Sequence, residues 1–476
     1  MKQADWNTVC EEVRKGRMVQ THSAQVRPGD IFVALAGTRV HGTCFAAEAV
    51  QRGAVFIVTN DRSLQLPPEA ALVYHENPAQ ALGELAVLYF QREKKQPRIV
   101  AVTGTNGKTT TAYLIEHLLV ANRHQAGLIG TVVCRWPGHS QAASMTTPDC
   151  WTLHALLARM AENDVSCVSM EVSSHALAQQ RLAGLRPEVA VFTNLTQDHL
   201  DYHQTMEAYF EAKLQLFQQD VLRVVNVDDP YGLRIADAFS CLRFTFAADT
   251  GRTDTLYGKV TRLDREGLCL ECCYQGRKWT VRSRLVGLFN ASNLLAAQGV
   301  GLALGFLPEQ LDVFTDFSGA PGRLQRVLGT SLHVFVDYAH TPDALENVCS
   351  TLKQLDYGRL IVLFGCGGDR DRGKRPLMGA AVARYADRAI VTSDNPRHED
   401  ARQIIQDIVP GFEGFSEYIC EPDRKKAIGL ALDELGENDV LLIAGKGHEN
   451  YQQLGGIKYD FDDYQVAREY LVACDR

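Results

Sequence analysis

The segment Arg98-Ile-Val-Ala-Val-Thr103, followed by Gly104-Thr-Asn-Gly-Lys-Thr-Thr110, decides the fold of this chain. Its first part is a run of apolar and β-branched residues, which predicts a buried strand. The second part predicts a phosphate-binding loop that leads into a helix over Ala112–Leu119. A strand, a glycine-rich loop and a helix in this order are typical of an α/β protein that binds a nucleotide.

The residue types of the loop suit an anion. Its glycines let backbone N–H groups turn toward phosphate oxygens, and the positive end of the following helix points the same way. Lys108 can reach the β- and γ-phosphate oxygens, and the hydroxyl of Thr109 can ligate magnesium. A glycine-rich surface turn is the alternative. The place of the loop between a strand and a helix favours the nucleotide site.

Length and composition exclude several classes of protein. The chain has 476 residues, more than one hydrophobic core usually serves, so we expect two or three domains. A formal net charge of -8 with interspersed signs gives no basic patch, so nucleic acid is not an expected partner. The start of the chain lacks an apolar signal region, and no apolar run approaches about eighteen residues. We therefore expect neither export nor membrane insertion.

The thirteen cysteines are odd in number and irregularly spaced, which is typical of reduced thiols in a cytoplasmic protein. Their only cluster is Cys269, Cys272 and Cys273. A second Cys or His pair at zinc-site spacing is absent, and the sequence alternates like a strand there. The cluster therefore predicts a strand rather than a zinc site.

The pattern of strands and helices predicts an α/β fold with three domains, over residues 1–93, 97–320 and 323–476. A polar linker over 91–97 and a Gly-Ala-Pro-Gly break at 319–322 separate them. Apolar runs alternate with helical segments in all three, as in a parallel sheet covered by helices. The predicted elements are strands at 30–36, 54–59, 98–103, 165–171, 189–194, 223–226, 332–337, 360–365, 388–392 and 440–444, a helix near 45–52, and an antiparallel patch over 242–286.

Polar residues follow the central strands, where open α/β sheets collect ligands. Glu171 ends one strand and could hold a metal ion beside Thr109. The segment Thr193–His203 ends another and is rich in oxygen and nitrogen ligands. Each segment alone could equally be a turn with capping residues. Together with the phosphate loop after the strand over 98–103, they make three polar strand ends in one domain, which favours a magnesium–nucleotide site.

Eight motifs in order along the chain together resemble the Mur ligases. They are GTNGKTT at 104–110, MEVSSHAL at 170–177, TNLTQDHLDYH at 193–203, GLFNASN at 287–293, DYAHTPDAL at 337–345, FGCGGDRDRGKRP at 364–376, SDNPR at 393–397 and AGKGHE at 444–449. The resemblance covers nearly the whole chain.

The resemblance implies a UDP-binding N-terminal domain, a central P-loop ATPase domain with a parallel sheet and a C-terminal Rossmann-like domain. It implies an ATP-dependent ligase of peptidoglycan synthesis that adds meso-diaminopimelate to UDP-N-acetylmuramoyl-L-alanyl-D-glutamate. A carboxylate of that substrate would become an acyl phosphate, and the incoming amine would displace phosphate. Such a reaction gathers negative charges, which a lysine and metal ions can neutralise.

The resemblance also implies roles for particular residues. Mg²⁺ would be held by Thr109 and Glu171, and a second metal site would involve His199 and Lys213, carbamylated by carbon dioxide. From the residues alone, Lys213 reads as an exposed helix residue. Lys108 would be catalytic with Glu171, His199 and Lys213.

The resemblance also implies which residues contact each substrate. ATP would contact Gly104, Thr105, Asn106, Gly107, Lys108, Thr109, Thr110, Asn293, Arg323 and Asp337. The UDP substrate would contact Ser23, Thr146, Thr147, Ser173, Gln179 and Arg181. The amino acid would contact Arg370, Asp394, Asn395, Pro396, Arg397, Gly445 and Glu449.

Arg397 has a physical reason for its place, because its planar fork can hold the distal carboxylate of meso-diaminopimelate bidentately. Three alternatives remain: a lysine-adding relative, the more distant folylpolyglutamate synthase, and a catalytically silent nucleotide-binding partner protein. Retention of the lysines and metal ligands argues against the last. We expect a monomer.

The chain departs from the family pattern at four positions. His22 and Ala24 flank Ser23 where the family usually has Asp-Ser-Arg. His41 stands where an aspartate often precedes the glycine, and Tyr464 stands where arginine is common. The first three bear on the uracil end of the substrate.

Overall fold

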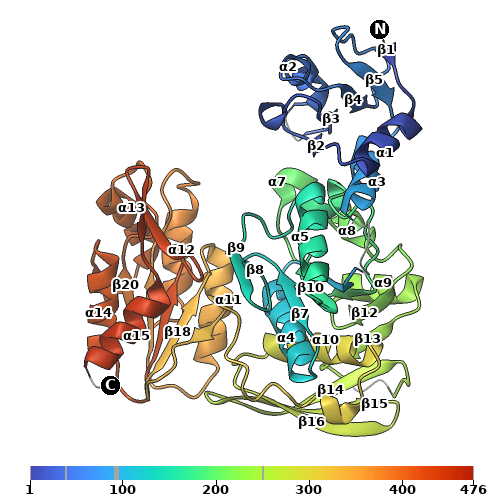
Figure 1. Ribbon diagram of the computed structural model, residues 1–476. Helices are drawn as coiled ribbons and strands as arrows, with labels where there is room; N and C mark the ends of the chain where they lie inside the picture. The colour runs from blue at the N-terminus through green and yellow to red at the C-terminus, as the bar shows by residue number, and fades with distance from the viewer. Residues whose placement is uncertain (1, 38–39, 91–95, 249–250, 475–476) are drawn as a thin grey trace. The chain divides into compact units, whose positions relative to one another are not determined.

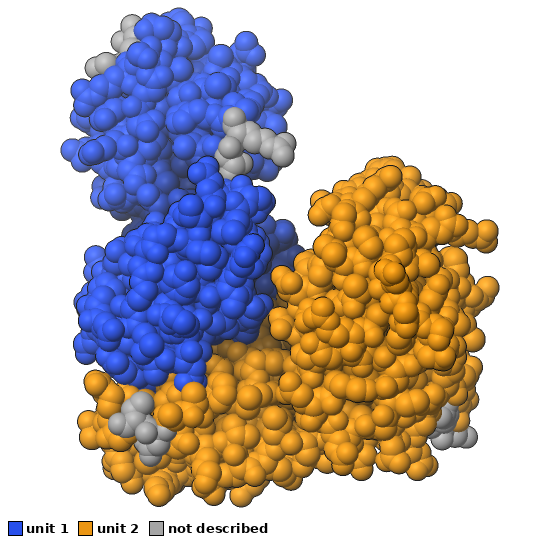
Figure 2. Space-filling view, turned by 180° about the vertical axis from the view of Figure 1, so that it is seen from behind, with its two compact units in different colours: residues 1–108, 119–243 blue, residues 109–118, 244–476 orange. Residues whose placement is uncertain are grey.

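The computed structural model describes residues 2–37, 40–90, 96–248 and 251–474 (Figure 1). It divides into two compact units, residues 1–108 with 119–243 and residues 109–118 with 244–476 (Figure 2). No helix within the described ranges is both long enough and apolar enough to cross a membrane. The domain limits predicted at 93–97 and 320–323 stay predictions, and most of that first linker lies outside the described residues.

The first unit begins with a parallel five-stranded sheet in the order β1-β5-β4-β3-β2. Its strands are β1 (Lys2–Gln3), β2 (Val19–Gln20), β3 (Ile31–Val33), β4 (Phe56–Thr59) and β5 (Ala71–Tyr74), and its helices are α1 (Trp6–Arg14), α2 (Ala46–Gln51) and α3 (Pro78–Phe90). Strand β3 is shorter than the predicted 30–36. Asp30 instead accepts a hydrogen bond from the backbone N–H of Arg27 (2.9 Å), which places it in the preceding turn.

The same unit continues into the predicted central sheet, ordered β12-β11-β6-β10-β7-β8-β9. The strands β6 (Arg98–Thr103), β7 (Ala126–Ile129), β10 (Cys167–Glu171), β11 (Val189–Phe192) and β12 (Leu222–Asn226) are parallel. An antiparallel edge follows, made of β8 (Val133–Trp136) and β9 (His139–Ala142), which the sequence did not predict. The helices are α4 (Lys108–Ala121), α5 (Cys150–Glu162), α6 (Ser174–Ala178), α7 (Leu200–His203), α8 (Met206–Leu214) and α9 (Pro230–Ala238).

The phosphate loop lies at the carboxyl end of the middle strand β6. All residues of β6 after Arg98 are buried, as a parallel strand covered on both faces requires. Helix α4 begins at Lys108 itself, four residues before its predicted start. The loop between β6 and α4 is therefore as short as the motif allows, and the first N–H groups of α4 follow it directly.

The second unit contains the predicted antiparallel patch and the last α/β sheet. The patch is β14 (Thr255–Asp264), β15 (Gly267–Tyr274) and β16 (Arg277–Ser283), after the short strand β13 (Leu242–Thr245) and before α10 (Phe289–Ala303). The cysteine cluster lies in β15 as predicted, with Cys272 buried and the pKa of its thiol raised by burial. All thirteen cysteines are free thiols.

The last sheet has the order β17-β18-β22-β19-β20-β21 and is parallel except for β17. Its strands are β17 (Gln325–Arg326), β18 (His333–Asp337), β19 (Leu360–Phe364), β20 (Arg388–Val391), β21 (Tyr418–Cys420) and β22 (Val440–Ala444). Its helices are α11 (Pro342–Lys353), α12 (Lys374–Ala383), α13 (Ala401–Ile408), α14 (Arg424–Glu434) and α15 (Asp463–Ala473), and a hairpin of β23 (Tyr451–Leu454) and β24 (Ile457–Asp460) precedes α15. Alternate residues of each central strand enter separate hydrophobic cores on the two faces of the sheet. Because both faces are buried, a nearly continuous apolar run in the sequence correctly predicts each of these strands.

Candidate active site

The phosphate loop is held in shape by the segment after β11. Gly104 has φ +149°, and a Cβ there would lie 1.9 Å from Thr193 Oγ1, so only glycine fits. Asn194 accepts the backbone N–H of Thr105 on its carbonyl and that of Asn106 on its side-chain oxygen, both at 2.9 Å. The two strand ends that the sequence placed at one sheet edge therefore meet, and the loop forms a fixed cradle.

Two lysines converge on this cradle. Lys108 Nζ donates to the carbonyls of Gly104 (3.0 Å) and Thr105 (2.8 Å), and Lys213 Nζ donates to the same Gly104 oxygen (2.9 Å). The side chain of Lys213 is buried, with the residue 1% exposed, so the exposed-residue interpretation is wrong. Burial first, and then the nearby charge of Lys108, lower the pKa of Lys213 well below its ordinary value. This amine is therefore a buried group whose neutral form is favoured.

Glu171, at the end of β10, is completely buried. Its two carboxylate oxygens accept from the backbone N–H (2.8 Å) and the hydroxyl (3.0 Å) of Thr131. Gly130 permits this approach, because a Cβ there would lie 2.3 Å from Glu171 Oε1. Sequence reasoning missed Thr131, since it comes from the turn between β7 and the unpredicted strand β8.

His199 belongs to a cluster of aromatic side chains rather than standing alone. Its ring lies edge-on to His175 (centroids 4.9 Å apart), and its Nε2 is 3.4 Å from the Asp198 carboxylate. His203 accepts or donates a hydrogen bond with Ser174 Oγ (2.9 Å). Burial, with His175, Lys213 and His199 contributing, lowers the pKa of His203 to about 4. Burial also lowers the pKa of His175, so it disfavours the charged form of both His175 and His203.

Within the described part of the chain, no three His, Cys, Asp or Glu side chains converge in a way that could hold a metal ion. Magnesium, however, is usually bound through one or two carboxylates together with substrate phosphates. Glu171, a buried carboxylate at the end of β10, is a ligand of the type that magnesium takes in such sites.

Five of the six predicted UDP-substrate residues form one hydrogen-bonded group. Thr147 Oγ1 donates to the Glu171 carbonyl (2.9 Å) and accepts from Ser173 N (3.0 Å). Arg181 donates to the Thr147 carbonyl (2.6 Å) and, twice, to Gln179 Oε1 (3.1 and 2.9 Å). Thr131 Oγ1 bonds to Thr146 Oγ1 (3.1 Å), which links the group to Glu171.

Ser23, the sixth, is separate. Its hydroxyl donates to Glu48 (2.7 Å), and no hydrogen bond between described residues links it to the other five. Of the departures nearby, His41 accepts the N–H of Thr43 (3.3 Å), and nothing in the structure explains His22 or Ala24. Tyr464 accepts the N–H of Leu328 (3.4 Å) through its hydroxyl.

Three of the predicted ATP contacts, Asn293, Arg323 and Asp337, lie in the second unit. Asn293 and Asp337 already form hydrogen bonds within the protein. Asn293 accepts from Thr111 Oγ1 (3.3 Å) and donates to Asn290 (2.8 Å). The Asp337 carboxylate accepts the N–H groups of Leu324 (2.7 Å) and Ala339 (2.8 Å), and its burial raises its pKa.

Arg323 stacks its guanidinium over the ring of Tyr338, with 4.8 Å to the centroid.

The predicted amino-acid residues converge at the carboxyl ends of β20 and β22. Asn395 Nδ2 donates to Glu449 (2.8 Å), and its Oδ1 accepts from Lys446 Nζ (3.1 Å) and from Gln453 N (2.9 Å). Lys446 is completely buried, and its amine also lies 3.4 Å from Asp394 and 3.6 Å from Glu449. Gly445, with φ +114°, begins the loop that carries Lys446.

Arg397 stands at a special backbone position. Its φ is +54°, in the left-handed region, and its N–H and C=O bond to Gln453 O (3.0 Å) and Gly455 N (2.7 Å) of the β23–β24 hairpin. One guanidinium nitrogen donates to Gly368 O (2.7 Å). The rest of the half-buried fork remains for another acceptor. Pro396 precedes it, and Arg370 is exposed on the same loop as Gly368.

Sequence reasoning missed Thr131, Lys446, Gln453 and the role of Asn194. For Lys446 the available signal was its place between the predicted contacts Gly445 and Glu449. The hairpin residue Gln453 had no signal, because its partner lies 58 positions earlier in the chain.

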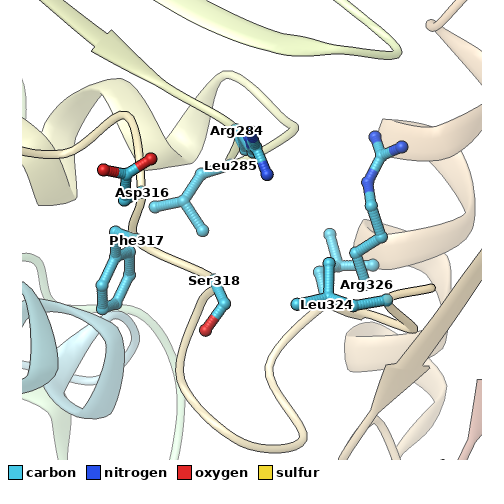
Figure 3. Close-up of a pocket in the computed structure, with 8 residues that line it drawn as sticks. Arg284, Leu285, Asp316, Phe317, Ser318, Leu324 and Arg326 are labelled. Atoms are coloured by element: carbon cyan, nitrogen blue, oxygen red, sulfur yellow. The ribbon is translucent and has the colours of Figure 1, made fainter.

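A cavity of about 60 Å³ lies elsewhere in the second unit, beside β17 (Figure 3). It is lined by Arg284, Leu285, Asp316, Phe317, Ser318, Leu324, Arg326 and Leu328. It contains none of the predicted site residues, and it is too small for a nucleotide, since ligand pockets usually measure about 300–1,000 Å³.

A glycine-rich cradle with converging lysines at the carboxyl end of a parallel sheet defines a nucleotide-binding α/β protein. Residues 16–90 match the Mur ligase family catalytic domain, 102–301 the Mur ligase middle domain and 322–447 the Mur ligase glutamate ligase domain. The chain belongs to the Mur ligase family, as its motifs predicted.

Individual relatives cover almost the whole chain. A UDP-N-acetylmuramoyl-L-alanyl-D-glutamate--2,6-diaminopimelate ligase of Lawsonia intracellularis is 44% identical over 469 residues, 97% of each chain. A solved structure of an enzyme with that name is 35% identical, with a TM-score of 0.72 over 96% of this chain and 95% of that one. The MurF ligase of Thermotoga maritima in complex with ADP shares the fold at 19% identity, with a TM-score of 0.57 over 97% of both chains.

Proposed function

We propose that this protein is an ATP-dependent amide-bond ligase that adds meso-2,6-diaminopimelate to UDP-N-acetylmuramoyl-L-alanyl-D-glutamate in peptidoglycan precursor synthesis. The observation that carries the proposal is the 44% identity over 97% of the chain to a relative of that name. The site agrees chemically, because it combines a phosphate cradle with a second, polar cluster at strand ends of another sheet. A cytoplasmic location and a monomeric state stay predictions.

The cradle suits transfer of a phosphoryl group to a carboxylate. The Lys108 ammonium and the backbone N–H groups of the loop that Asn194 does not engage, which excludes those of Thr105 and Asn106, would stabilise the phosphate oxygens. The substrate carboxylate would become an acyl phosphate, and the amine of the amino acid would then displace phosphate. ATP enters as the phosphoryl donor and leaves as ADP. The asparagine Asn194 fixes the loop, so little reorganisation is needed when phosphate binds.

The residues present fit magnesium, which would supply positive charge to the phosphate oxygens. Thr109 and Glu171 would hold one ion, and His199 with carbamylated Lys213 would serve a second. Lys213 is suited to carbamylation because its buried amine, with a lowered pKa, is available in the neutral form that attacks carbon dioxide. Attack of the neutral amine on carbon dioxide forms an N–C bond, turns one C=O bond of carbon dioxide into a C–O⁻ group and releases one proton, so that a neutral amine becomes an anionic carbamate.

We expect Lys213→Ala to lose nearly all ligase activity, because the anionic ligand would be absent. A short carboxylate such as acetate should restore part of the activity by occupying the same space. The matched control is Lys108→Ala, which acetate should not rescue. Full activity of Lys213→Ala, or no carbamate ¹³C signal in wild-type protein given labelled bicarbonate and magnesium–nucleotide, would contradict the proposal.

The proposed function is tested by the product. We expect the mass of the product formed from a panel of amino acids, with ATP and the UDP-dipeptide, to show addition of meso-diaminopimelate and little of L-lysine. Predominant lysine addition would favour the lysine-adding relative instead. ATP hydrolysis without any ligated product, in the presence of every amine, would favour a protein without ligase activity.

A further inference from the structure

The two loops of the amino-acid cluster come from strands that are not neighbours. Asp394–Arg397 follows β20, Gly445–Glu449 follows β22, and β19 lies between these strands in the sheet. Asn395 and Glu449 nevertheless form a hydrogen bond of 2.8 Å across the gap. Lys446, from the second loop, also bonds to Asn395 of the first (3.1 Å). These contacts join the outer parts of the loops, whereas the points where the loops leave the sheet are held by a different side chain.

One side chain reaches the base of both loops. Arg424, the first residue of α14, donates to the carbonyls of Ser393 (3.2 Å) and Ala444 (2.9 Å). Ser393 directly precedes Asp394, and Ala444 directly precedes Gly445. The planar guanidinium thus spans the two points where the loops leave the sheet, which a single-point ammonium could not do with the same geometry.

Asp463 completes this arrangement from a different helix. As the first residue of α15, it accepts Arg424 Nε on one oxygen and Nη2 on the other, both at 2.7 Å. Both side chains are 0% exposed. A buried pair of this kind contributes little net stability compared with apolar residues of the same volume, so its presence calls for a different reason.

We propose that the buried pair Arg424–Asp463 is a positioning device that fixes the loop after β20 and the loop after β22 in the relative placement that amino-acid binding requires. The inference rests on the proposed function, because it takes the two loops as the amino-acid site. Neither residue touches the amino acid. Arg424 acts through the backbone of Ser393 and Ala444, and Asp463 acts through Arg424.

The chain provides a matched control on the same strand and helix. Arg388, the first residue of β20, pairs bidentately with Glu434, the last residue of α14, at 2.9 and 3.0 Å. This pair lies at the amino end of β20, away from the loops. It therefore resembles Arg424–Asp463 in its bidentate chemistry, although its side chains are 22% and 35% exposed, and it does not hold the site.

The experiment measures steady-state kinetics of the full chain for all three substrates, together with thermal unfolding. We expect Arg424→Lys to raise KM for meso-diaminopimelate about 10–100-fold, the range seen when supporting contacts of a site are lost. KM for ATP and for the UDP-dipeptide should change less than about twofold. Arg388→Lys should leave all three KM values near wild type.

Two further variants separate positioning from stability. Asp463→Asn keeps the shape, and Arg424→Met with Asp463→Leu leaves no unpaired buried charge, so the latter is expected to fold with near wild-type stability. Both should still raise KM for meso-diaminopimelate selectively. A folded variant of either kind with an unchanged KM, or with all three KM values raised alike, would overturn the inference. If wild-type protein formed no product with meso-diaminopimelate, the proposed function itself would fail instead.

Discussion

Lys108→Ala is expected to fold normally and to lose ligation by at least about 10²–10³-fold. Removing one charged donor from a preorganised phosphate site costs about 3–4 kcal/mol of transition-state stabilisation, and the reaction gathers several negative charges at this point. The amine of Lys108 already lies on the loop, 2.8–3.0 Å from the carbonyls of Gly104 and Thr105. Turnover measured as ADP and amide product checks the expectation.

The control for this variant is Lys15→Ala, because Lys15 is a surface lysine of the same unit, 68% exposed and paired with Glu12. It should keep full activity. Circular dichroism and thermal unfolding establish that Lys108→Ala is folded. A folded Lys108→Ala protein with wild-type turnover would show that the cradle does not bind the reacting phosphate.

Arg397→Ala is expected to raise KM for meso-diaminopimelate by about one to three orders of magnitude. Truncating one partner of a desolvated charge pair costs about 2–5 kcal/mol, and each decade corresponds to about 1.4 kcal/mol. The structure supports this role, because Gly368 O engages one guanidinium nitrogen and leaves the rest of the fork for a carboxylate. Lysine should stay a poor substrate, since removing a charge creates no pocket for its side-chain end.

Two further variants serve as controls. The first addresses the unusual backbone of Arg397, whose φ is +54°, and the second addresses the loss of an exposed arginine. Arg397→Gly relieves that strain yet should lose the same affinity, which separates the side chain from the backbone. Arg402→Ala, at an exposed arginine in the second position of α13, should change nothing. Equal use of L-lysine by the wild type, or an unchanged KM in Arg397→Ala, would favour the lysine-adding relative.

Most of the fold could be predicted because its strands are buried on both faces. Continuous apolar runs such as 440–444 coincide with β22 to the residue, and 360–365 differs from β19 by one. The edge strands β8 and β9 were not predicted, because β9 is fully exposed and carries no apolar pattern. Strand β3 is shorter than predicted at both ends: the N–H of Asp30 donates to Arg27 O in a turn (3.0 Å), and beyond the strand Leu35 O accepts the N–H of Gly42 (2.8 Å).

The candidate site could be predicted only where its chemistry is local in the sequence. The phosphate loop reads directly from Gly104–Thr110. Asn194, which shapes the loop, and Thr131, which holds Glu171, come from segments that follow other strands. Lys213 shows the limit most clearly. A lysine in a helix reads as exposed, and only the packing of α8 against the cradle reveals that its amine is buried. The roles assigned to individual residues by resemblance stay predictions.

The hairpin β23–β24 has a consequence for how the amino acid arrives. It bonds to the backbone of Arg397 on both sides, and Gln453 N bonds to the side chain of Asn395. Ordering a residue's backbone costs about 1–2 kcal/mol of conformational entropy, and folding has already met that cost here. Association with the amino acid should therefore proceed in one kinetic phase, without a slow step of loop closure at this edge. The hairpin itself contributes to affinity through preorganisation of Arg397 and Asn395 rather than through contacts of its own.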